Sequence, residues 1–272
     1  MTIKIFTMVR DEADIVSAWV HYHGDLFGYN NLFIIDNFSV DGTFETLRTI
    51  QETHPIHIIR EPDYKKKGEY MTRLIRQHFH PMENGLAIPM DIDEFIVHYN
   101  KTSRQICCDR SSIHHYINGL APSKIYKMNY ILAKPIGTQG KGNLSDIRLG
   151  TYQEYGNMAK IFLRTILFRN DVLDHGNHFP NTPYIMTDLC LVHFHFRNSL
   201  QMKKKVSCNV TGLGYPAELS FLKTLMDDDP HCNGHHHVLT MIEFLEERYH
   251  FPDFQTDPST DIDLSPLQEW FL

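Results

Sequence analysis

The stretch GLAIPMDIDEF, residues 85–95, decides the fold expected for this chain. Its first part, residues 85–90, is apolar and has the length of a short strand, and the acidic residues Asp91 to Glu94 follow directly. A continuous apolar run is typical of a strand buried on both faces of a parallel sheet. Because such sheets bind ligands beyond the carboxyl ends of their strands, the acidic residues are expected at a binding site.

Upstream of this stretch, strand-like and helix-like segments alternate. Three more strands are predicted, at residues 3–8, 32–35 and 56–59. Apolar residues recur at helical spacing between them, and the first of these helices is expected to be capped by Asp11 and ended by Gly28. The order β-α-β-α-β-α-β predicts an α/β protein whose parallel sheet carries helices on both faces, because parallel neighbours need crossover connections.

Downstream of the stretch the patterns are weaker. Loops are predicted at residues 137–143 and 174–183, and helix-like segments at residues 217–226 and 238–248 lead into a tail rich in Pro and Asp. The histidine-rich segment 231–237 is expected to be a flexible loop, because adjacent histidines cannot all point at one metal ion.

Composition excludes several classes of protein. The 272 residues are 42% hydrophobic and 22% charged, which is typical of one globular domain with at most a modest appendage. The net charge of −7 argues against a protein that coats nucleic acid or an anionic membrane. No apolar run approaches the roughly 18 to 20 residues of a membrane helix and the N-terminus lacks the pattern of a signal peptide, so a cytosolic protein is expected. The five cysteines form no CxxC pair and are expected to be free thiols.

Asp91 and Asp93 form a DxD pair directly after the predicted strand. Two carboxylates at a strand end can hold a divalent cation, which can bridge a nucleotide diphosphate. The alternatives are a solvated acidic turn or a helix start. Two further DxD segments, residues 227–229 and 261–263, lie in loop-like and tail-like contexts, so position rather than spacing distinguishes the first pair.

The segment LVHFHFR, residues 191–197, has the two-residue period of a strand. His193, His195 and Arg197 fall on one face, where imidazoles can bind a metal and a guanidinium can bind phosphate. The alternative is a half-exposed strand with titratable residues on its wet side. If this segment meets Asp91 and Asp93, the combined oxygen and nitrogen ligands suit Mn²⁺ or Mg²⁺.

Other polar residues allow two interpretations each. Asp36 follows the second predicted strand, where a carboxylate can accept hydrogen bonds from a ribose, whereas Asp41 and Thr43 are expected only to cap the next helix. The lysine runs 65–67 and 203–205 are each either a solvated surface or a phosphate contact. The chain has no GxGxxG, GxxxxGK[ST] or GxSxG motif, which argues against a dinucleotide cofactor, a P-loop and a hydrolase nucleophile elbow.

Four segments together resemble one known family. They are MVRDEADIVSAWVHYH at residues 8–23, IIDNFSVDGT at 34–43, PMDIDEFI at 89–96 and VHFHFRNS at 192–199. The chain resembles GT-A fold glycosyltransferases of the glycosyltransferase 2-like type, close to the DUF23 family and glycosyltransferase family 92. The chain departs from the family pattern at Asp11, where Asn is commoner, and at Asn198, which is inserted between Arg197 and Ser199.

The resemblance implies a GT-A catalytic domain at residues 1–205, with a Rossmann-like, mixed and mainly parallel sheet. Its nucleotide-sugar half would span about residues 1–98 and its acceptor half about residues 99–205, and residues 206–272 would form a C-terminal helical extension packed on the same domain. The implied reaction transfers a hexosyl or pentosyl group from a nucleotide sugar, UDP-linked, to a hydroxyl of a glycan acceptor, with Mn²⁺ or Mg²⁺ and with inversion. Relatives in animal secretory pathways carry a membrane anchor, so the chain is expected to be a stand-alone cytoplasmic enzyme of a bacterium or a large DNA virus.

The resemblance also implies roles for particular residues. Asp93 would bind the metal, Asp91 would bind metal or ribose, and His193 or His195 would complete the metal shell, with His195 favoured. The residues expected at the nucleotide sugar from the resemblance are Arg10, Asp36, Asp91, Arg197 and Lys203. Arg73, which follows the lysine run 65–67, is also expected there as a phosphate contact. The candidates for the base that deprotonates the acceptor are Glu94, Asp171, Asp174 and Asp188. His178 is expected to line the acceptor site.

Two other functions remain open at this point. A sugar-binding module would keep the fold without turnover. A phosphohydrolase of the haloacid dehalogenase type also places DxD after a strand, but it needs Thr or Val where this chain has Phe95. The transferase hypothesis depends on one spatial prediction, that the acidic pair and the imidazoles near residue 194 face one another across a cleft.

Overall fold

The structure of the chain is a computed structural model. It describes residues 2–78, 85–121, 125–136, 143–156, 159–164, 173, 176–177, 183–252, 254 and 257–271. The loops predicted at residues 137–143 and 174–183 lie mostly outside these residues, as do Asp171, Asp174 and His178.

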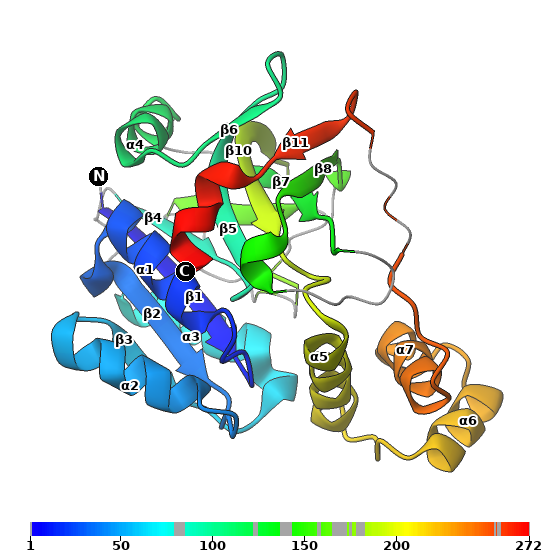
Figure 1. The fold of residues 1–272 in the computed structure, drawn as a ribbon. Helices are drawn as coiled ribbons and strands as arrows, with labels where there is room; N and C mark the ends of the chain where they lie inside the picture. The colour runs from blue at the N-terminus through cyan, green and yellow to red at the C-terminus, as the bar shows by residue number, and fades with distance from the viewer. Residues whose placement is uncertain are drawn as a thin grey trace.

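One mixed sheet runs through the molecule (Figure 1). Its strands are β1 (Thr2–Val9), β2 (Leu32–Asp36), β3 (His57–Arg60), β4 (Gly85–Pro89), β5 (Glu94–Asn100), β6 (Gln105–Cys107), β7 (Ile125–Ala133), β8 (Leu149–Gln153), β9 (Lys160–Arg164), β10 (Ile185–His193) and β11 (Asp261–Asp263). The strand order is β3-β2-β1-β4-β9-β7-β10-β5-β6, with β8 paired to β7 and β11 paired to β8. The predicted mixed α/β class is therefore confirmed.

Parallel pairing is concentrated in the N-terminal part of the sheet. The order β3-β2-β1-β4 is parallel throughout, as the alternation of strands and helices predicts. Among the described residues, the other parallel pair is β7 with β10, and the remaining pairs are antiparallel. The sheet thus has a doubly covered parallel half, which needs crossover helices, and a mixed half in which the described pairs other than β7 with β10 are antiparallel.

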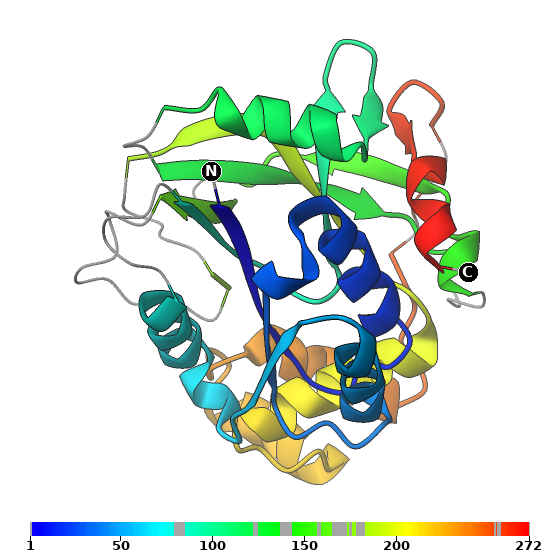
Figure 2. The ribbon, with the colours of Figure 1, turned by 90° about the vertical axis from the view of Figure 1, so that its left-hand side faces the viewer.

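Two apolar cores cover the faces of the parallel half. Ile3 and Ile5 of β1 point to one face, while Phe6 and Met8 point to the other, as the two-residue period of a strand requires. The helices are α1 (Val16–Phe27), α2 (Thr43–Thr53), α3 (Lys67–His78), α4 (Arg110–Asn118), α5 (Ser199–Gly212), α6 (Leu219–Asp228) and α7 (His235–Leu245). Helices α1 and α2 pack on the first face and α3 on the second, so β1 lies between α1 and α3 (Figure 2).

The turn between β1 and α1 differs from the prediction. Helix α1 begins at Val16, so Asp11 is not its cap and that prediction is wrong. Asp11 instead adopts a positive φ of 56°, and its backbone N–H donates to Ser39 Oγ at 3.0 Å. The turn at residues 11–15 is thereby tied to the loop after β2, next to the site described below. Gly28 ends the helix as predicted, with a φ of 90° and its N–H bonded to the carbonyl of Gly24.

The C-terminal part of the chain combines helices with a return to the sheet. Helices α5, α6 and α7 share a small apolar core of their own. His235 to His237 begin α7, so the expectation of a flexible loop for the histidine-rich segment is wrong for these three residues. After α7 the chain runs back to the sheet, where β11 pairs with β8 and the 3₁₀ helix η6 (Ser265–Phe271) packs beside α1 (Figure 1). No helix within the described part of the chain is both long and apolar enough to span a membrane.

Candidate active site

The ends of the parallel strands bring the predicted polar residues to one edge of the sheet. Val9 and Asp36 are register partners at the ends of β1 and β2, and the N–H of Asn37 donates to the carbonyl of Val9 at 2.8 Å. The N–H of Met90, just after β4, donates to the carbonyl of Phe6 at 3.0 Å. The segments that follow these three strands, including Arg10 and Asp91, therefore start side by side.

The antiparallel half brings the histidines to the same edge. His193 at the end of β10 is the register partner of Glu94 at the start of β5. One residue further on, the N–H of Phe194 donates to the carbonyl of Asp93 at 2.9 Å. The acidic segment and the imidazoles near residue 194 therefore lie together as predicted, but on paired backbone segments rather than on opposite sides of a cleft. The strand predicted over residues 191–197 ends at His193, so His195 and Arg197 lie beyond it.

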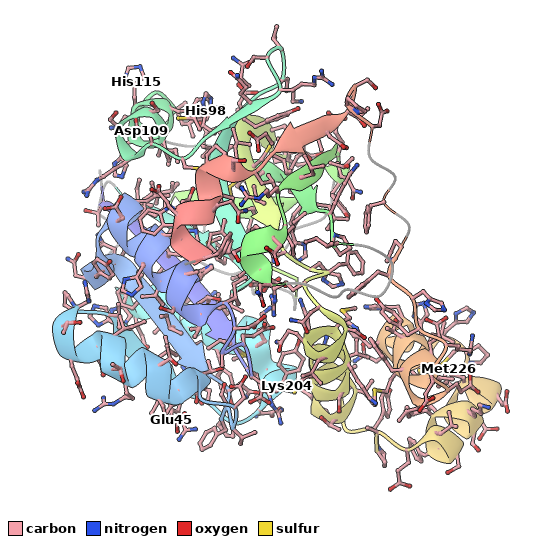
Figure 3. All side chains as sticks on the ribbon, viewed as in Figure 1. Glu45, His98, Asp109, His115, Lys204 and Met226 are labelled. Carbon is pink, nitrogen blue, oxygen red and sulfur yellow. The ribbon has the colours of Figure 1, made fainter. Side chains whose placement is uncertain are left out.

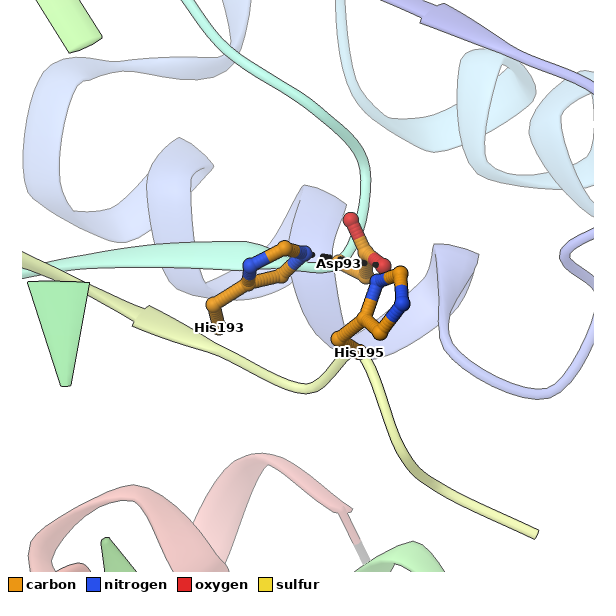
Figure 4. Close-up of side chains that lie close together, drawn as sticks. All are labelled: Asp93, His193 and His195. Atoms are coloured by element: carbon orange, nitrogen blue, oxygen red, sulfur yellow. Dashed lines mark ion pairs between the residues drawn. The ribbon is translucent and has the colours of Figure 1, made fainter. Parts of the chain in front are cut away.

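Asp93, His193 and His195 form a group that could hold a metal ion (Figure 4). One ligand atom from each side chain lies within 4.8 Å of the others, and His193 Nε2 lies 3.4 Å from Asp93 Oδ2. Burial, then the charges of Lys205 and His193, hold the pKa of His195 well below its ordinary value, so its imidazole is neutral and keeps a lone pair for a ligand. One carboxylate oxygen and two ring nitrogens are a donor set that suits a divalent cation such as Mn²⁺, so the residues fit this group.

Asp93 is almost fully buried and is surrounded by positive charge. Its side chain is 2% exposed, and Asp93 Oδ2 lies 2.5 Å from Lys205 Nζ and 3.7 Å from Arg197 Nη1. Burial opposes ionisation of this carboxyl, but Lys205, His193 and Arg197 outweigh burial and hold its pKa well below the usual range. Asp93 is therefore a carboxylate at neutral pH, although water barely reaches it.

Asp91 has different partners from Asp93. Its Oδ1 lies 2.6 Å from Lys67 Nζ and its Oδ2 lies 2.7 Å from Lys160 Nζ, so a lysine occupies each oxygen. Burial opposes ionisation of Asp91, but Lys160 and then Lys67 outweigh it, and the pKa lies far below the ordinary value. Asp91 does not belong to the group of possible metal ligands found among the described residues.

Glu94 lies behind the two aspartates. It is 1% exposed, its Oε2 accepts the backbone N–H of Asp91 at 2.7 Å, and its Oε1 lies 3.3 Å from Lys160 Nζ. Burial raises the pKa of Glu94. The hydrogen bond to the Asp91 backbone stabilises the turn between β4 and β5. This turn positions the side chains of both aspartates.

Asp91, Asp93, His193 and His195 border a cavity of about 230 Å³. The sheet edge and the segments beside it contribute Arg10, Glu12, Lys67, Asp91, Asp93, His193 and His195. The C-terminal helices contribute Lys205, Asn209 and His237, and His237 Nε2 accepts a hydrogen bond from Asn209 Nδ2 at 3.3 Å. Burial, then the neighbouring His236 and Lys205, lowers the pKa of His237 to about 3, so its ring is neutral. The cavity therefore combines carboxylates, neutral imidazoles and ammonium groups.

Arg197 was expected at the nucleotide sugar, but it is enclosed by acidic side chains. Its own side chain is 2% exposed and does not belong to the cavity lining. It forms ion pairs with Glu12 and, at 3.0 Å, with Asp14, in addition to the contact with Asp93. Burial opposes the charge of Arg197, but Glu12, Asp14 and Asp93 outweigh it and raise its pKa. In this structure Arg197 ties the turn after β1 to Asp93.

Four other predicted residues lie away from the cavity lining. Asp36 is fully buried and its Oδ2 accepts from Arg60 Nε at 2.9 Å. Arg73 pairs with Glu61 on the outside of α3, Lys203 is exposed on α5, and Asp188 is exposed on β10. Of the predicted nucleotide-sugar residues, Arg10 and Asp91 line the cavity. Of the predicted bases that the structure describes, Glu94 lies next to the cavity and Asp188 does not. The other two predicted bases, Asp171 and Asp174, lie outside the described residues, as does the acceptor candidate His178.

Sequence reasoning missed several charged or polar residues of the cavity region. They are Glu12, Lys160 and Asn209. Lys67 and Lys205 belong to the lysine runs for which a phosphate contact was one of two interpretations, and His237 belongs to the segment that was expected to be a loop. Helical spacing is the signal that could have found Lys205 and Asn209, because both lie beside the buried stripe of Met202, Val206 and Val210 on α5. Lys160 lies in a region with no clear pattern, and nothing local distinguishes it.

Comparison with known proteins gives limited information. No model of a known protein family matches the chain, and no curated protein sequence matches it. Among solved structures, residues 1–349 of S. aureus TarS align over 91% of this chain and 71% of that one, with 8% identity and a TM-score of 0.43. The same TarS segment in complex with UDP aligns with the same coverage, 9% identity and a TM-score of 0.43. A longer TarS structure aligns over 91% of this chain and 43% of that one, with 10% identity and a TM-score of 0.39. Likeness at this level does not by itself assign an activity to the chain.

Proposed function

We propose that the chain is a metal-dependent glycosyltransferase that moves a hexosyl or pentosyl group from a UDP-linked sugar to a hydroxyl of a glycan acceptor, with inversion. One observation carries the proposal: the ligand group Asp93, His193 and His195 lies on the same cavity as Lys205, Lys67 and Arg10. A nucleoside diphosphate carries anionic phosphates. A protein can bind it with a metal ion and with basic side chains, because both balance the phosphate charge.

The chemistry follows from the charges of these residues. Departure of the diphosphate places negative charge on its terminal phosphate, and a divalent cation held by Asp93, His193 and His195 would neutralise part of it. Lys205 and Arg10 line the same cavity and can donate to phosphate oxygens. Lys67 also lines the cavity, and its Nζ lies 2.6 Å from Asp91 Oδ1. These cations would act on the leaving group, where charge develops in the transition state.

The test is release of UDP from a panel of UDP-sugars in the presence of a range of glycan acceptors, with Mn²⁺ and with a chelator. Wild-type protein is expected to release UDP only with the metal. Asp93→Ala is expected to lower the rate by about 100-fold or more, because loss of a metal ligand removes several kcal/mol of charge stabilisation. Asp227→Ala is the matched control, since Asp227 belongs to another DxD segment and is exposed at the end of α6, and its rate should equal that of wild type.

Other outcomes would lead to other functions. Binding of UDP-sugars without any release, in the presence of a range of glycan acceptors, would contradict the transferase and indicate a sugar-binding module. Hydrolysis of simple phosphate esters that depends on Asp91 would indicate a phosphohydrolase instead.

A further inference from the structure

Lys205 contacts two of the three residues that could hold the metal. Its Nζ lies 2.5 Å from Asp93 Oδ2 and 3.4 Å from His195 Nδ1. An ammonium group has no lone pair and carries one positive charge, so it interacts with the same lone pairs that a metal ion would use. The ammonium and a divalent cation therefore compete for Asp93 and His195.

Arg197 also contacts Asp93, but it is fixed. Glu12 and Asp14 hold its guanidinium, and its side chain is 2% exposed. Lys205 differs because its side chain is 20% exposed and lines the cavity. A lysine has a flexible four-carbon stem, so its ammonium can change partners without moving α5. Of these two cations, Lys205 is the one that can leave Asp93.

The buried carboxylate explains why a replaceable cation is needed. Asp93 is 1% exposed, and a buried charge without a partner costs several kcal/mol. Lys205 supplies the nearest positive charge when no metal is present, since its Nζ lies 2.5 Å from Asp93 Oδ2 and Arg197 Nη1 lies 3.7 Å away. Once a metal takes over that role, the ammonium is free to pair with an anion in the cavity.

We propose that Lys205 is an exchangeable counter-ion of the metal group: it neutralises Asp93 in the metal-free protein and transfers to a phosphate of the nucleotide when the metal binds. This inference rests on the proposed function, because it takes the metal group and a nucleoside diphosphate as the ligands of the cavity. It assigns Lys205 to binding of the nucleotide-sugar donor, whereas the sequence analysis expected Lys203 in that role. No bond is made or broken in this exchange, so only ionic partners change.

The exchange predicts opposite effects on two ligands. In Lys205→Met the competitor is gone, so the Kd for Mn²⁺ without nucleotide should fall about 10-fold, within the range usual for coupled sites. The Kd for UDP in the presence of Mn²⁺ should rise about 10-fold, because one charge-assisted contact to phosphate is lost. Mn²⁺ binding can be followed by electron paramagnetic resonance and UDP binding by calorimetry. A purely structural role of Lys205 would weaken both ligands.

The matched control is Lys223→Met, which removes the same charge from an exposed position on α6. Both Kd values should stay at the wild-type level. Lys205→Gln provides a second variant if the methionine variant does not fold, and it should shift the two Kd values in the same opposite directions. Lys205→Arg keeps a competing cation and should leave the Mn²⁺ affinity near that of wild type.

The results separate the exchange from the proposed function. Wild-type protein that binds neither Mn²⁺ nor UDP would overturn both. Wild-type protein that binds both ligands, with an unchanged or weaker Mn²⁺ affinity in Lys205→Met and Lys205→Gln, would overturn the exchange alone. Tighter Mn²⁺ binding together with weaker UDP binding in these variants would support it.

Discussion

Three consecutive lysines on α5 have three different environments. Lys203 is exposed, Lys204 Nζ lies 2.6 Å from Asp41 Oδ2, and Lys205 reaches Asp93. Figure 3 labels Lys204 on this helix. Successive helical residues point about 100° apart, so neighbours in sequence face different partners. The role of a lysine here follows from its helical position rather than from its presence in a basic run.

His23 is a second residue whose environment defines its chemistry. It is fully buried in α1, its Nδ1 lies 3.0 Å from the carbonyl oxygen of Trp19, and its Nε2 accepts the backbone N–H of Ile96 at 3.4 Å. The neutral ring with a proton on Nδ1 satisfies both contacts. Burial lowers the pKa of His23 to about 3, although the hydrogen bond to Trp19 opposes this. The folded protein therefore keeps His23 neutral at a pH where the unfolded chain protonates it.

This difference predicts that acid destabilises the fold through His23. The unfolded chain binds the proton first, so the stabilisation is complete above about pH 6.5 and is lost as the pH falls toward 3. Below pH 6.5 the contribution of His23 to the free energy of unfolding should decrease by up to about 1.4 kcal/mol per pH unit. His23→Gln should reduce the slope between pH 6.5 and 4.5 by that amount, as measured by urea unfolding. Equal slopes in variant and wild type would show that His23 does not carry this effect.

At the scale of elements, the C-terminal segment belongs to the main core. Strand β11 pairs with β8, and η6 places Leu267 among the buried residues of the larger core. Phe271 lies against Phe95 and Phe194, with ring centroids 5.3 Å and 5.0 Å apart. Phe95 is two residues from Asp93 and Phe194 lies between His193 and His195, so this packing supports the segments that carry the ligand group.

Leu267→Ala is therefore expected to destabilise the whole fold. Leu267 is fully buried, and truncation of such a leucine to alanine costs about 2 to 5 kcal/mol through lost contacts and the cavity left behind. Urea unfolding measures this loss. Leu239→Ala on α7 is the control, because Leu239 is 46% exposed and its truncation should change the free energy of unfolding by at most about 0.5 kcal/mol. A loss below about 1 kcal/mol for Leu267→Ala would mean that η6 is not part of the cooperative core.

At the scale of the molecule, the cavity joins parts of the chain that are distant in sequence. Lys67 and Asp91 are 24 residues apart, Lys160 and Asp91 are 69 apart, and Lys205 and Asp93 are 112 apart. The sheet edge and the segments beside it supply the carboxylates, His193 and His195, and α5 and α7 supply Lys205, Asn209 and His237. The C-terminal helices therefore complete the site in addition to packing on each other.

This arrangement predicts that α7 contributes to substrate binding. His237→Ala should raise the KM for the UDP-sugar about 10-fold, since loss of one polar contact in a buried site costs on the order of 1 to 1.5 kcal/mol. His236→Ala is the control, because His236 precedes it on the same helix and is exposed. Steady-state kinetics on both variants, with urea unfolding as a check on folding, measure the difference. The same KM in both variants would show that α7 does not contact the donor.

The sequence by itself determined that the first four strands are parallel and that Asp91 and Asp93 directly follow the fourth of them. These features follow from local periods of two and 3.6 residues, which report the face of an element that a residue occupies. Tertiary structure alone decided that Lys67 and Lys160 hold Asp91, that acidic residues enclose Arg197, and that Lys205 rather than Lys203 reaches Asp93. The physical reason is that such ion pairs join elements far apart along the chain, and their partners depend on how whole faces pack, which no local period encodes.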